Sequence, residues 1–236
     1  MSGDFFKSQT RRLDGINILS ELDPGERERI TQNCHWHHYS NQEQIIDRQN
    51  ITTDVYFIVQ GTVRVVNYSL SGREITLDDL TVGDSFGELA AIDSQPRSAS
   101  VMALTDCSIA SLGQAQFLTL LKTQGSVAIR VMELMARVIR TSTARIMDLS
   151  TLAANNRVQA ELLRQAKSRD NIDNTSVIKP IPIHSDIASR VSTTRETVTR
   201  VLSDLTRNGI LERQRGGLKI LDVERLQDMV EEVRGE

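Results

Sequence analysis

Residues 126–154, SVAIRVMELMARVIRTSTARIMDLSTLAA, determine how the chain is organised. Apolar residues recur there in steps of four and three, which is the spacing of a two-stranded coiled-coil seam. We therefore predict a long dimerisation helix over 126–154 and a homodimer formed through it. The seam positions are Ala128, Met132, Met135, Ile139, Ser142, Ile146, Leu149 and Ala153, of which Ser142 is polar.

A second apolar stripe, Val127 to Val138, lies beside the seam and ends before Arg145 and Asp148. This pattern predicts that the first half of the helix is buried on two sides, against its partner and against the preceding domain. The polar break in the seam has two interpretations. Ser142 sets the register of the two helices, or Ser142 and Thr143 meet a polar ligand.

The composition indicates an ordinary protein of two domains, with 236 residues, 39% hydrophobic residues and a formal net charge of −3. No apolar run is long enough to span a membrane, and residues 1–15 lack the apolar core of a signal peptide, so we expect a cytoplasmic protein. The two cysteines, Cys34 and Cys107, make neither a disulfide framework nor a four-cysteine site. The net charge argues against indiscriminate binding to polyanions, although residues 181–220 form a local basic block.

Short strands separated by turn residues fill the first half of the chain. Many short strands at even spacing predict an antiparallel barrel or roll. The apolar face from Leu13 to Leu22 predicts a helix before the strands, and a second helix should start at Asp23 as N-cap with Pro24 in its first turn. A short helix over 114–122 leads into the long one, and the helical pattern continues past Ala153 to about Lys167. The predicted strands are 34–39, 44–46, 55–59, 62–68, 74–80, 99–103 and 107–112.

Residues 83–90, GDSFGELA, and 95–99, QPRSA, form the first group of chemical interest. The glycine-rich turn can aim backbone N–H groups at an anion, and Glu88 can accept a hydrogen bond from a hydroxyl group. Arg97 beside Ser98 can clamp a phosphate. The alternative is an ordinary turn with charged side chains in solvent.

Residues 183–202 form the second group. Two short apolar faces predict two helices joined by a turn, and Thr193 with Glu196 predicts a capping box at the start of the second helix. Arg195, Glu196, Thr199 and Arg200 stay on its polar side, near the end that would enter a major groove. Residues 210–214 and 218–221 predict a following hairpin. Taken alone, this charged cluster is equally compatible with a solvated helix face.

Together these segments resemble the CRP/FNR superfamily of bacterial transcription regulators, most closely its cyclic-AMP receptor branch. FGELA followed by PRSA resembles the phosphate-binding cassette of cyclic-nucleotide-binding domains, and RETVTRVL resembles the recognition helix. The resemblance implies an α+β fold in three parts. These are an N-terminal antiparallel β-roll that binds cyclic nucleotides (1–125), the dimerisation helix (126–154) and a C-terminal winged helix-turn-helix (155–236).

The resemblance also implies roles for the ligand-binding residues. Arg97 and Ser98, with backbone groups at Gly87 and the neighbouring Leu89 of the cassette, would hold the cyclic phosphate. Glu88 would hold the ribose 2′-hydroxyl. Ser142 would touch the base in its own subunit, and Thr143 the base of the partner's nucleotide.

For double-stranded DNA, the resemblance implies that Arg195, Glu196 and Arg200 read bases, while His184 and Thr197 contact the DNA backbone. Ser192 stands where the family has a glycine in the turn. RNA polymerase is a further expected partner, through His35 and His37 in the segment CHWHH, although Gln116 replaces a lysine of the family's contact surface. These histidines lack the further ligands that a structural metal site needs.

The sequence therefore predicts a homodimeric transcription regulator that depends on cAMP and binds a palindromic TGTGA-like site. We expect no catalytic residues, no metal and no membrane association. The open alternatives in the same family are sensors of cGMP, of a haem-bound gas or of redox state. Alternatives of other classes are an enzyme acting on cyclic nucleotides, for which a metal-binding His/Asp cluster is missing, and a regulatory subunit that acts through protein contacts alone.

Overall fold

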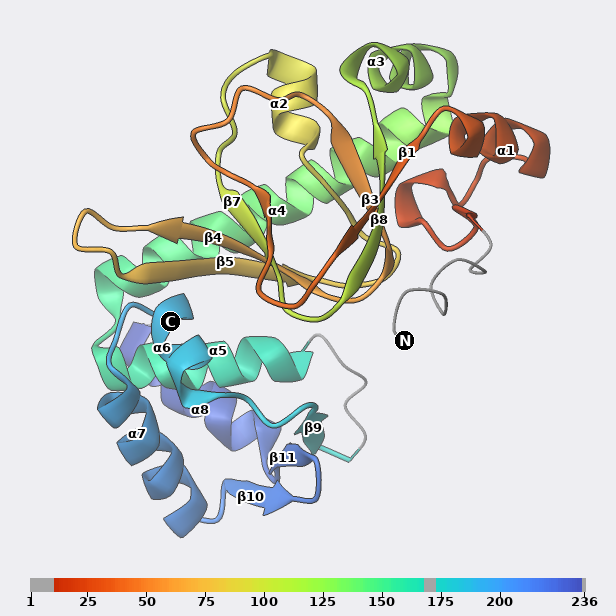
Figure 1. Ribbon diagram of the computed structural model, residues 1–236. Coiled ribbons are helices and arrows are strands. Elements are labelled where there is room, and N and C mark those ends of the chain that lie inside the picture. The colour runs from red at the N-terminus through yellow and green to blue at the C-terminus, as the bar shows by residue number, and fades with distance from the viewer. Residues whose placement is uncertain (1–10, 168–172, 235–236) are drawn as a thin grey trace, which may run out of the picture. The chain divides into compact units, whose positions relative to one another are not determined.

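The computed structural model describes residues 11–167 and 173–234 (Figure 1). The chain divides into two compact units, one formed by Met1–Tyr68 with Thr76–Arg137 and the other by Ser69–Ile75 with Val138–Glu236. Within the described ranges, no helix is both long and apolar enough to cross a membrane. The predicted α+β class is confirmed, with a β-rich first part, a long helix and a C-terminal helix-turn-helix.

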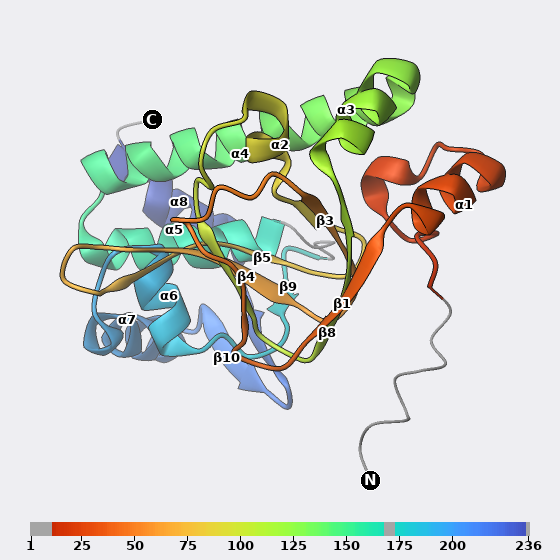
Figure 2. The same cartoon turned by 45° about the horizontal axis from the view of Figure 1, so that its top comes forward.

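The first unit contains two four-stranded antiparallel sheets, with strand orders β1-β8-β3-β6 and β2-β7-β4-β5. Both views show β1, β8 and β3 side by side (Figures 1 and 2). The seven predicted strands are confirmed to within a residue or two, and β6 is an addition. The strands are β1 (His35–Tyr39), β2 (Gln44–Ile46), β3 (Val55–Gln60), β4 (Val63–Tyr68), β5 (Glu74–Leu80), β6 (Ser85–Phe86), β7 (Ser100–Ala103) and β8 (Cys107–Leu112).

Three helices accompany these sheets: α1 (Pro24–Gln32), α2 (Glu88–Asp93) and α3 (Gln114–Thr123). Asp23 caps α1 as predicted, because its carboxylate accepts hydrogen bonds from the N–H groups of Gly25 and Glu26. The prediction of a helix over the preceding apolar face was wrong. That segment forms only the 3-10 turn Asn17–Leu19, since its leucines and isoleucines are buried in the core on more than one side.

The long helix α4 (Gly125–Thr151) begins in the first unit and ends in the second. Val127 and Val131 are buried in the core of the first unit, which confirms the packing of the second apolar stripe against the preceding domain at these two positions, whereas Val138 at its end is 45% exposed. We predicted that the helical pattern continues without a break to about Lys167, and this prediction was wrong. Residues 152 and 153 interrupt it, because Leu152 turns into a small core with Ala160 and Val230, and a new helix starts at Ala154.

The second unit holds a winged helix-turn-helix. A three-stranded antiparallel sheet of order β10-β11-β9 accompanies its helices, and α5 and α8 lie side by side (Figures 1 and 2). The hairpin β10-β11 is the predicted wing, whereas α8 had no counterpart in the prediction. The elements are α5 (Ala154–Lys167), β9 (Ser176–Ile178), α6 (His184–Arg190), α7 (Arg195–Arg207), β10 (Leu211–Gln214), β11 (Gly217–Ile220) and α8 (Val223–Arg234).

The turn between α6 and α7 has two notable features. Ser192 has φ of 51°, a left-handed backbone conformation that favours glycine. Arg157 of α5 donates hydrogen bonds to the carbonyl groups of Val191 (2.8 Å) and Ser192 (3.1 Å), and also to that of Leu152 (2.9 Å). One guanidinium therefore fixes the turn to the start of α5.

We expect Ser192→Gly to raise the free energy of unfolding of the second unit by about 1 kcal/mol, because the left-handed conformation disfavours residues with a Cβ atom. Ser203→Gly, in the interior of α7, is the matched control and should lower it by about 0.5 kcal/mol. Thermal and urea denaturation of the full chain measure both. Destabilisation by Ser192→Gly would show that the turn carries no strain.

Candidate nucleotide pocket and nucleic-acid interface

The cassette turn lies between β6 and α2 and is centred on Gly87. This residue has φ of 88° and precedes the first residue of α2, Glu88. A Cβ atom at this position would lie 2.7 Å from the guanidinium of Arg97 and 2.8 Å from the carbonyl oxygen of Asp54. The sequence requires glycine here both for the backbone angle and for the close approach of these two groups.

Arg97 is the centre of the predicted phosphate site and is 3% exposed. Its Nη1 donates to the carbonyl oxygen of Gly87 (3.0 Å) and its Nη2 to that of Asp54 (2.9 Å). Its Nε donates to Oγ1 of Thr52 (3.2 Å), and its guanidinium lies 5.6 Å from the ring centroid of Tyr56. The side chain thus joins the turn at Gly87 to the loop that precedes β3.

No carboxylate of the described ranges forms an ion pair with Arg97. Burial lowers the pKa of Arg97, while the nearby Tyr56, Asp54 and Glu88 act in the opposite direction. The hydrogen bonds to three neutral oxygen atoms occupy only part of the five N–H groups of a guanidinium. A buried cation in this state is suited to an anionic ligand such as a phosphate.

Glu88 is the other ionisable residue of the cassette. Burial raises its pKa, although its own backbone N–H and the charge of Arg97 favour the ionised form. Leu89 is exposed and Ser98 is exposed beside Arg97. The structure therefore gathers the five predicted cassette residues in the first unit.

Ser142 and Thr143 lie on α4 in the second unit, and both side chains are exposed. Their assignment as contacts of the nucleotide base stays a prediction.

Four residues around the cassette escaped the sequence analysis: Thr52, Asp54, Tyr56 and Asn67. Asn67 of β4 donates from Nδ2 to the carbonyl oxygen of Ser98 (3.3 Å), and its Oδ1 is buried without a hydrogen-bond partner. Tyr56 also stacks on Phe86 of β6, with ring centroids 5.1 Å apart. The sequence offered one signal for two of these residues. Tyr56 and Asn67 lie in strands whose neighbours in the sheets flank the cassette.

The polar face of α7 carries the predicted base-reading residues. Arg195, Glu196 and Arg200 are exposed, while Val198, Val201 and Leu205 of the same helix are buried in the core of the second unit. Arg200 donates to Oδ1 of Asn155 at the start of α5 (3.4 Å), a contact that the sequence did not suggest. The base-reading side chains therefore project from a helix that is anchored along its opposite face.

The predicted capping box at Thr193 was wrong. Thr194 is the N-cap of α7, and its hydroxyl accepts a hydrogen bond from the N–H of Thr197 (3.2 Å). Thr193 is buried instead. Glu196 has a lowered pKa because of a backbone hydrogen bond and of its hydrogen bond with Thr194.

His184 begins α6 and contacts α7, because its Nδ1 lies 2.8 Å from Oγ1 of Thr199. The Thr199 hydroxyl donates its proton to the carbonyl oxygen of Arg195, so Nδ1 of His184 is the donor in this pair. Partial burial lowers the pKa of His184, as do Arg195 and Arg213 of the wing. Residues of α6, α7 and β10 thus form one basic surface.

His35 and His37 lie in β1, where Nε2 of His37 is 3.0 Å from Oγ of Ser111 on β8. Burial lowers the pKa of His37, and the neighbouring His35 adds to this effect. A contact with RNA polymerase at this strand stays a prediction.

Comparisons with known proteins agree with the assignment of the cassette and of the basic face of the helix-turn-helix. Residues 36–124 match the cyclic nucleotide-binding domain family, and residues 156–229 match the Crp-like helix-turn-helix domain family. The cAMP-activated global transcriptional regulator CRP of Salmonella typhimurium is 30% identical over 173 residues, which cover 73% of this chain and 82% of that protein.

Solved structures show the same fold. A CooA variant from Carboxydothermus hydrogenoformans superimposes with a TM-score of 0.79 at 21% identity, covering 94% of this chain and 97% of that one. The c-di-GMP-responsive global regulator CLP of Xanthomonas campestris gives a TM-score of 0.68 at 19% identity, covering 84% and 99%. The fold and the two surfaces define a transcription regulator with a cyclic nucleotide-binding domain and a DNA-binding helix-turn-helix. The chain belongs to the CRP/FNR family.

We expect Gly87→Ala to destabilise the protein and to weaken binding of any cassette ligand. Gly72→Ala is the matched control, since Gly72 also has a positive φ (77°) but has open space around it. The control should lose about 1 kcal/mol through the backbone angle alone, and Gly87→Ala should lose distinctly more because Cβ would collide with Arg97 and Asp54. Urea denaturation measures the difference. Equal losses would mean that the close approach at Gly87 is unimportant.

Glu88→Gln should stabilise the protein at pH 7. Because burial raises the pKa of Glu88, the folded protein holds this proton more tightly than the unfolded chain, so stability falls as pH rises through the interval between the two pKa values. Glutamine removes this penalty, and the gain should vanish below about pH 4, where the glutamate is protonated in both states. Thermal denaturation at both pH values, with exposed Glu28→Gln as control, tests the sign. A stability gain that persists unchanged at low pH would contradict this origin.

Proposed function

We propose that this protein is a homodimeric transcription regulator that binds cAMP in the cassette and a palindromic TGTGA-like DNA site through α7. The observation that carries the proposal is the buried guanidinium of Arg97, which hydrogen-bonds neutral oxygens and has no ion-pair partner in the described chain. Keeping such a charge buried is expensive unless it serves to bind an anion. A cyclic phosphate supplies one negative charge and acceptor oxygens of the geometry that arginine recognises.

The neighbouring groups favour a cyclic nucleotide over a bare anion. Glu88 would accept from the ribose 2′-hydroxyl, and Ser98 beside Arg97 would assist with the phosphate. Ser142 and Thr143, exposed on α4, offer hydroxyl groups to an adenine base. Hydroxyl groups both donate and accept, so they suit the amino group and ring nitrogens of adenine.

Dimerisation through α4 is supported by its exposed apolar side chains. Met132, Ile139, Ile146 and Leu149 are between 48% and 63% exposed and recur at coiled-coil spacing. An apolar stripe of this length that is exposed in the single chain indicates an interaction surface. A second copy of the same helix has the matching pattern and would cover it. The second chain would also bring its Thr143 to the ligand.

The basic surface of the second unit supports DNA binding. Arg195 and Arg200 can each donate two hydrogen bonds to guanine in the major groove, and Glu196 can accept one from cytosine. His184, Thr197 and the wing arginines would contact the backbone and fix the register of α7. Two such helices in a symmetric dimer would read a palindrome whose half-sites lie one helical turn apart.

Ligand and DNA would be coupled through the paired helices. Binding of the nucleotide by residues of both α4 helices favours one arrangement of the dimer, and that arrangement sets the spacing of the two recognition helices. The expected place of action is the cytoplasm, with RNA polymerase as a partner through His35 and His37. The protein performs no catalysis in this proposal.

Another cyclic nucleotide or another signal is the second candidate for the ligand. The neighbour CLP is described as responsive to c-di-GMP, and it shares the fold at low identity. The same family architecture thus accompanies a different small molecule, and the test includes cGMP and c-di-GMP alongside cAMP.

The test is a titration of a fluorescently labelled duplex bearing two TGTGA half-sites, at one fixed salt concentration, with and without each nucleotide. We expect binding to tighten at least tenfold with cAMP. Arg97→Gln should abolish this response, and Arg29→Gln, an exposed arginine on α1, should keep it. Nucleotide-independent binding would refute the cAMP switch, and absence of binding to this duplex under every condition would refute the half-site assignment.

A further inference from the structure

The side chain of His184 joins α6 to α7 through a chain of two hydrogen bonds. Its Nδ1 lies 2.8 Å from Oγ1 of Thr199, and the Thr199 hydroxyl lies 2.9 Å from the carbonyl oxygen of Arg195. A hydroxyl group has one proton to donate, and a carbonyl oxygen can only accept. The Thr199 proton is therefore directed at Arg195, and the proton between His184 and Thr199 is carried by Nδ1.

This proton on Nδ1 determines what the other ring nitrogen of His184 can do. In a neutral imidazole one nitrogen carries a proton and the other carries a lone pair, whereas the imidazolium has a proton on both. Nε2 of neutral His184 is therefore an acceptor. A phosphodiester oxygen also only accepts, so the neutral ring in this tautomer cannot donate a hydrogen bond from Nε2 to the DNA backbone, and the charged ring can.

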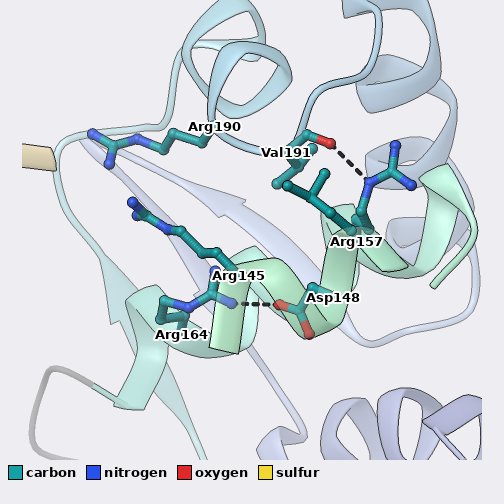
Figure 3. A pocket seen from close by; sticks show the side chains of 7 residues that line it. Arg145, Asp148, Arg157, Arg164, Arg190 and Val191 are labelled. Atoms are coloured by element: carbon teal, nitrogen blue, oxygen red, sulfur yellow. Dashed lines mark hydrogen bonds and ion pairs between the residues drawn. The ribbon is translucent and has the colours of Figure 1, made fainter. Parts of the chain in front are cut away.

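The two helices that carry this pair are fixed against each other. Ile187 of α6 and Val198 of α7 are buried in the same core. Arg157 also fixes the turn between the helices, and Figure 3 shows its hydrogen bond to the carbonyl group of Val191 at the end of α6 (2.8 Å). The tautomer of the histidine is therefore set by the scaffold of the second unit.

The charges that act on His184 are cationic. Partial burial lowers its pKa, and Arg195 of α7 and Arg213 of β10 lower it further, so the ring is neutral in the free protein at about pH 7. No carboxylate of the described ranges, Asp186 of the same helix included, forms an ion pair with His184. The same arginines attract a phosphate, and a phosphate beside the ring stabilises its charged form.

We propose that His184 couples DNA binding to the uptake of a proton, so that the affinity for DNA rises as the pH falls. The inference rests on the proposed function in one respect, which is the position of the DNA backbone beside α6. On binding, a proton moves from solvent to Nε2 of His184. This nitrogen then donates a hydrogen bond to a phosphate oxygen, while Nδ1 keeps its hydrogen bond to Thr199.

The direction of the pH dependence follows from the pKa of His184 in the two states. The phosphate raises this pKa in the complex above its value in the free protein. The affinity therefore rises as the pH falls through the pKa of the complex, and becomes constant below the pKa of the free protein. The three other histidines, at positions 35, 37 and 38, lie in β1 of the first unit.

The test measures the affinity of the full chain for two labelled duplexes, one with the TGTGA half-sites and one of random sequence, with and without cAMP at one fixed low salt concentration. We expect both duplexes to bind at least tenfold more tightly at about pH 6 than at about pH 8. Calorimetry in two buffers of different ionisation enthalpy should show net uptake of protons.

The two duplexes separate this proposal from the proposed function. Binding to the random duplex that depends on pH, without preference for TGTGA, would support the proton coupling and refute the half-site assignment. Preferential binding to TGTGA with an affinity that does not change with pH would support the proposed function and overturn the coupling.

His184→Arg supplies a permanent positive charge with donors that suit a phosphate. We expect this variant to bind at about pH 8 as tightly as the parent chain does at about pH 6, with no dependence on pH. His38→Gln, at an exposed histidine of β1, is the matched control and should keep the pH dependence of the parent. A pH dependence that persists in His184→Arg would assign the proton to another group and overturn the proposal.

Thr199→Val tests the role of the tautomer, because valine keeps the shape of the side chain and lacks the hydroxyl group. Nε2 of neutral His184 is then free to carry the proton, so binding at about pH 8 should be tighter than in the parent and the pH dependence weaker. Thr206→Val is the matched control, since the Thr206 hydroxyl also donates to the carbonyl four residues earlier in α7. A pH dependence equal to that of the parent in Thr199→Val would overturn this role.

The tautomer itself can be observed without DNA. Long-range ¹H–¹⁵N spectra of the free full chain at about pH 8 should show the His184 proton on Nδ1 in the parent and in Thr206→Val. In Thr199→Val the proton should be distributed over both nitrogens. A parent chain with the proton on Nε2 would overturn the proposal, whatever its affinity for DNA.

Discussion

A buried positive charge that forms no ion pair within the described residues constrains the first unit. The guanidinium of Arg97 can stay there only because backbone carbonyl groups of Gly87 and Asp54 turn toward it. Those carbonyl groups belong to segments far apart in the sequence, one after β6 and one before β3. The left-handed angle of Gly87 and the place of Tyr56 beneath the guanidinium both follow from this arrangement. The fold of the cassette is thus organised around the place where a ligand's charge would lie.

Much of the fold could be predicted from local patterns. The strands of the β-roll, the Asp23 cap and the wing were predictable because alternation, capping residues and glycine turns act over a few residues. The segment around Leu13 and Ile16 misled the prediction, because a helical spacing of apolar residues also arises where an irregular chain crosses a core. The break at Leu152 was equally hidden, since the helical periodicity of the sequence continues through it.

Site residues could be predicted where their types and order are distinctive in the sequence. Residues of common type in ordinary positions could not. Glycine, glutamate and arginine in fixed order marked the cassette, whereas Tyr56 lies on a strand that is almost wholly buried and therefore shows no alternation. Thr193 and Thr194 are adjacent and chemically alike, so only the backbone geometry decides which one caps α7. The contact between Arg200 and Asn155 joins residues 45 apart in sequence, which no local pattern encodes.

The contacts of Arg157 make the position of the recognition helix α7 independent of the side chains in the turn that precedes it. This arginine holds the turn before α7 by the carbonyl groups of Val191 and Ser192, and carbonyl groups are the same whatever side chains the turn carries. The orientation of α7 is therefore encoded in α5 and in the backbone, and its base preference is encoded in its own exposed face. The exposed residues of this segment, Arg195, Glu196 and Arg200, can accordingly be exchanged for those of another specificity while the buried Val198 is kept, which makes this unit a suitable host for grafted recognition surfaces.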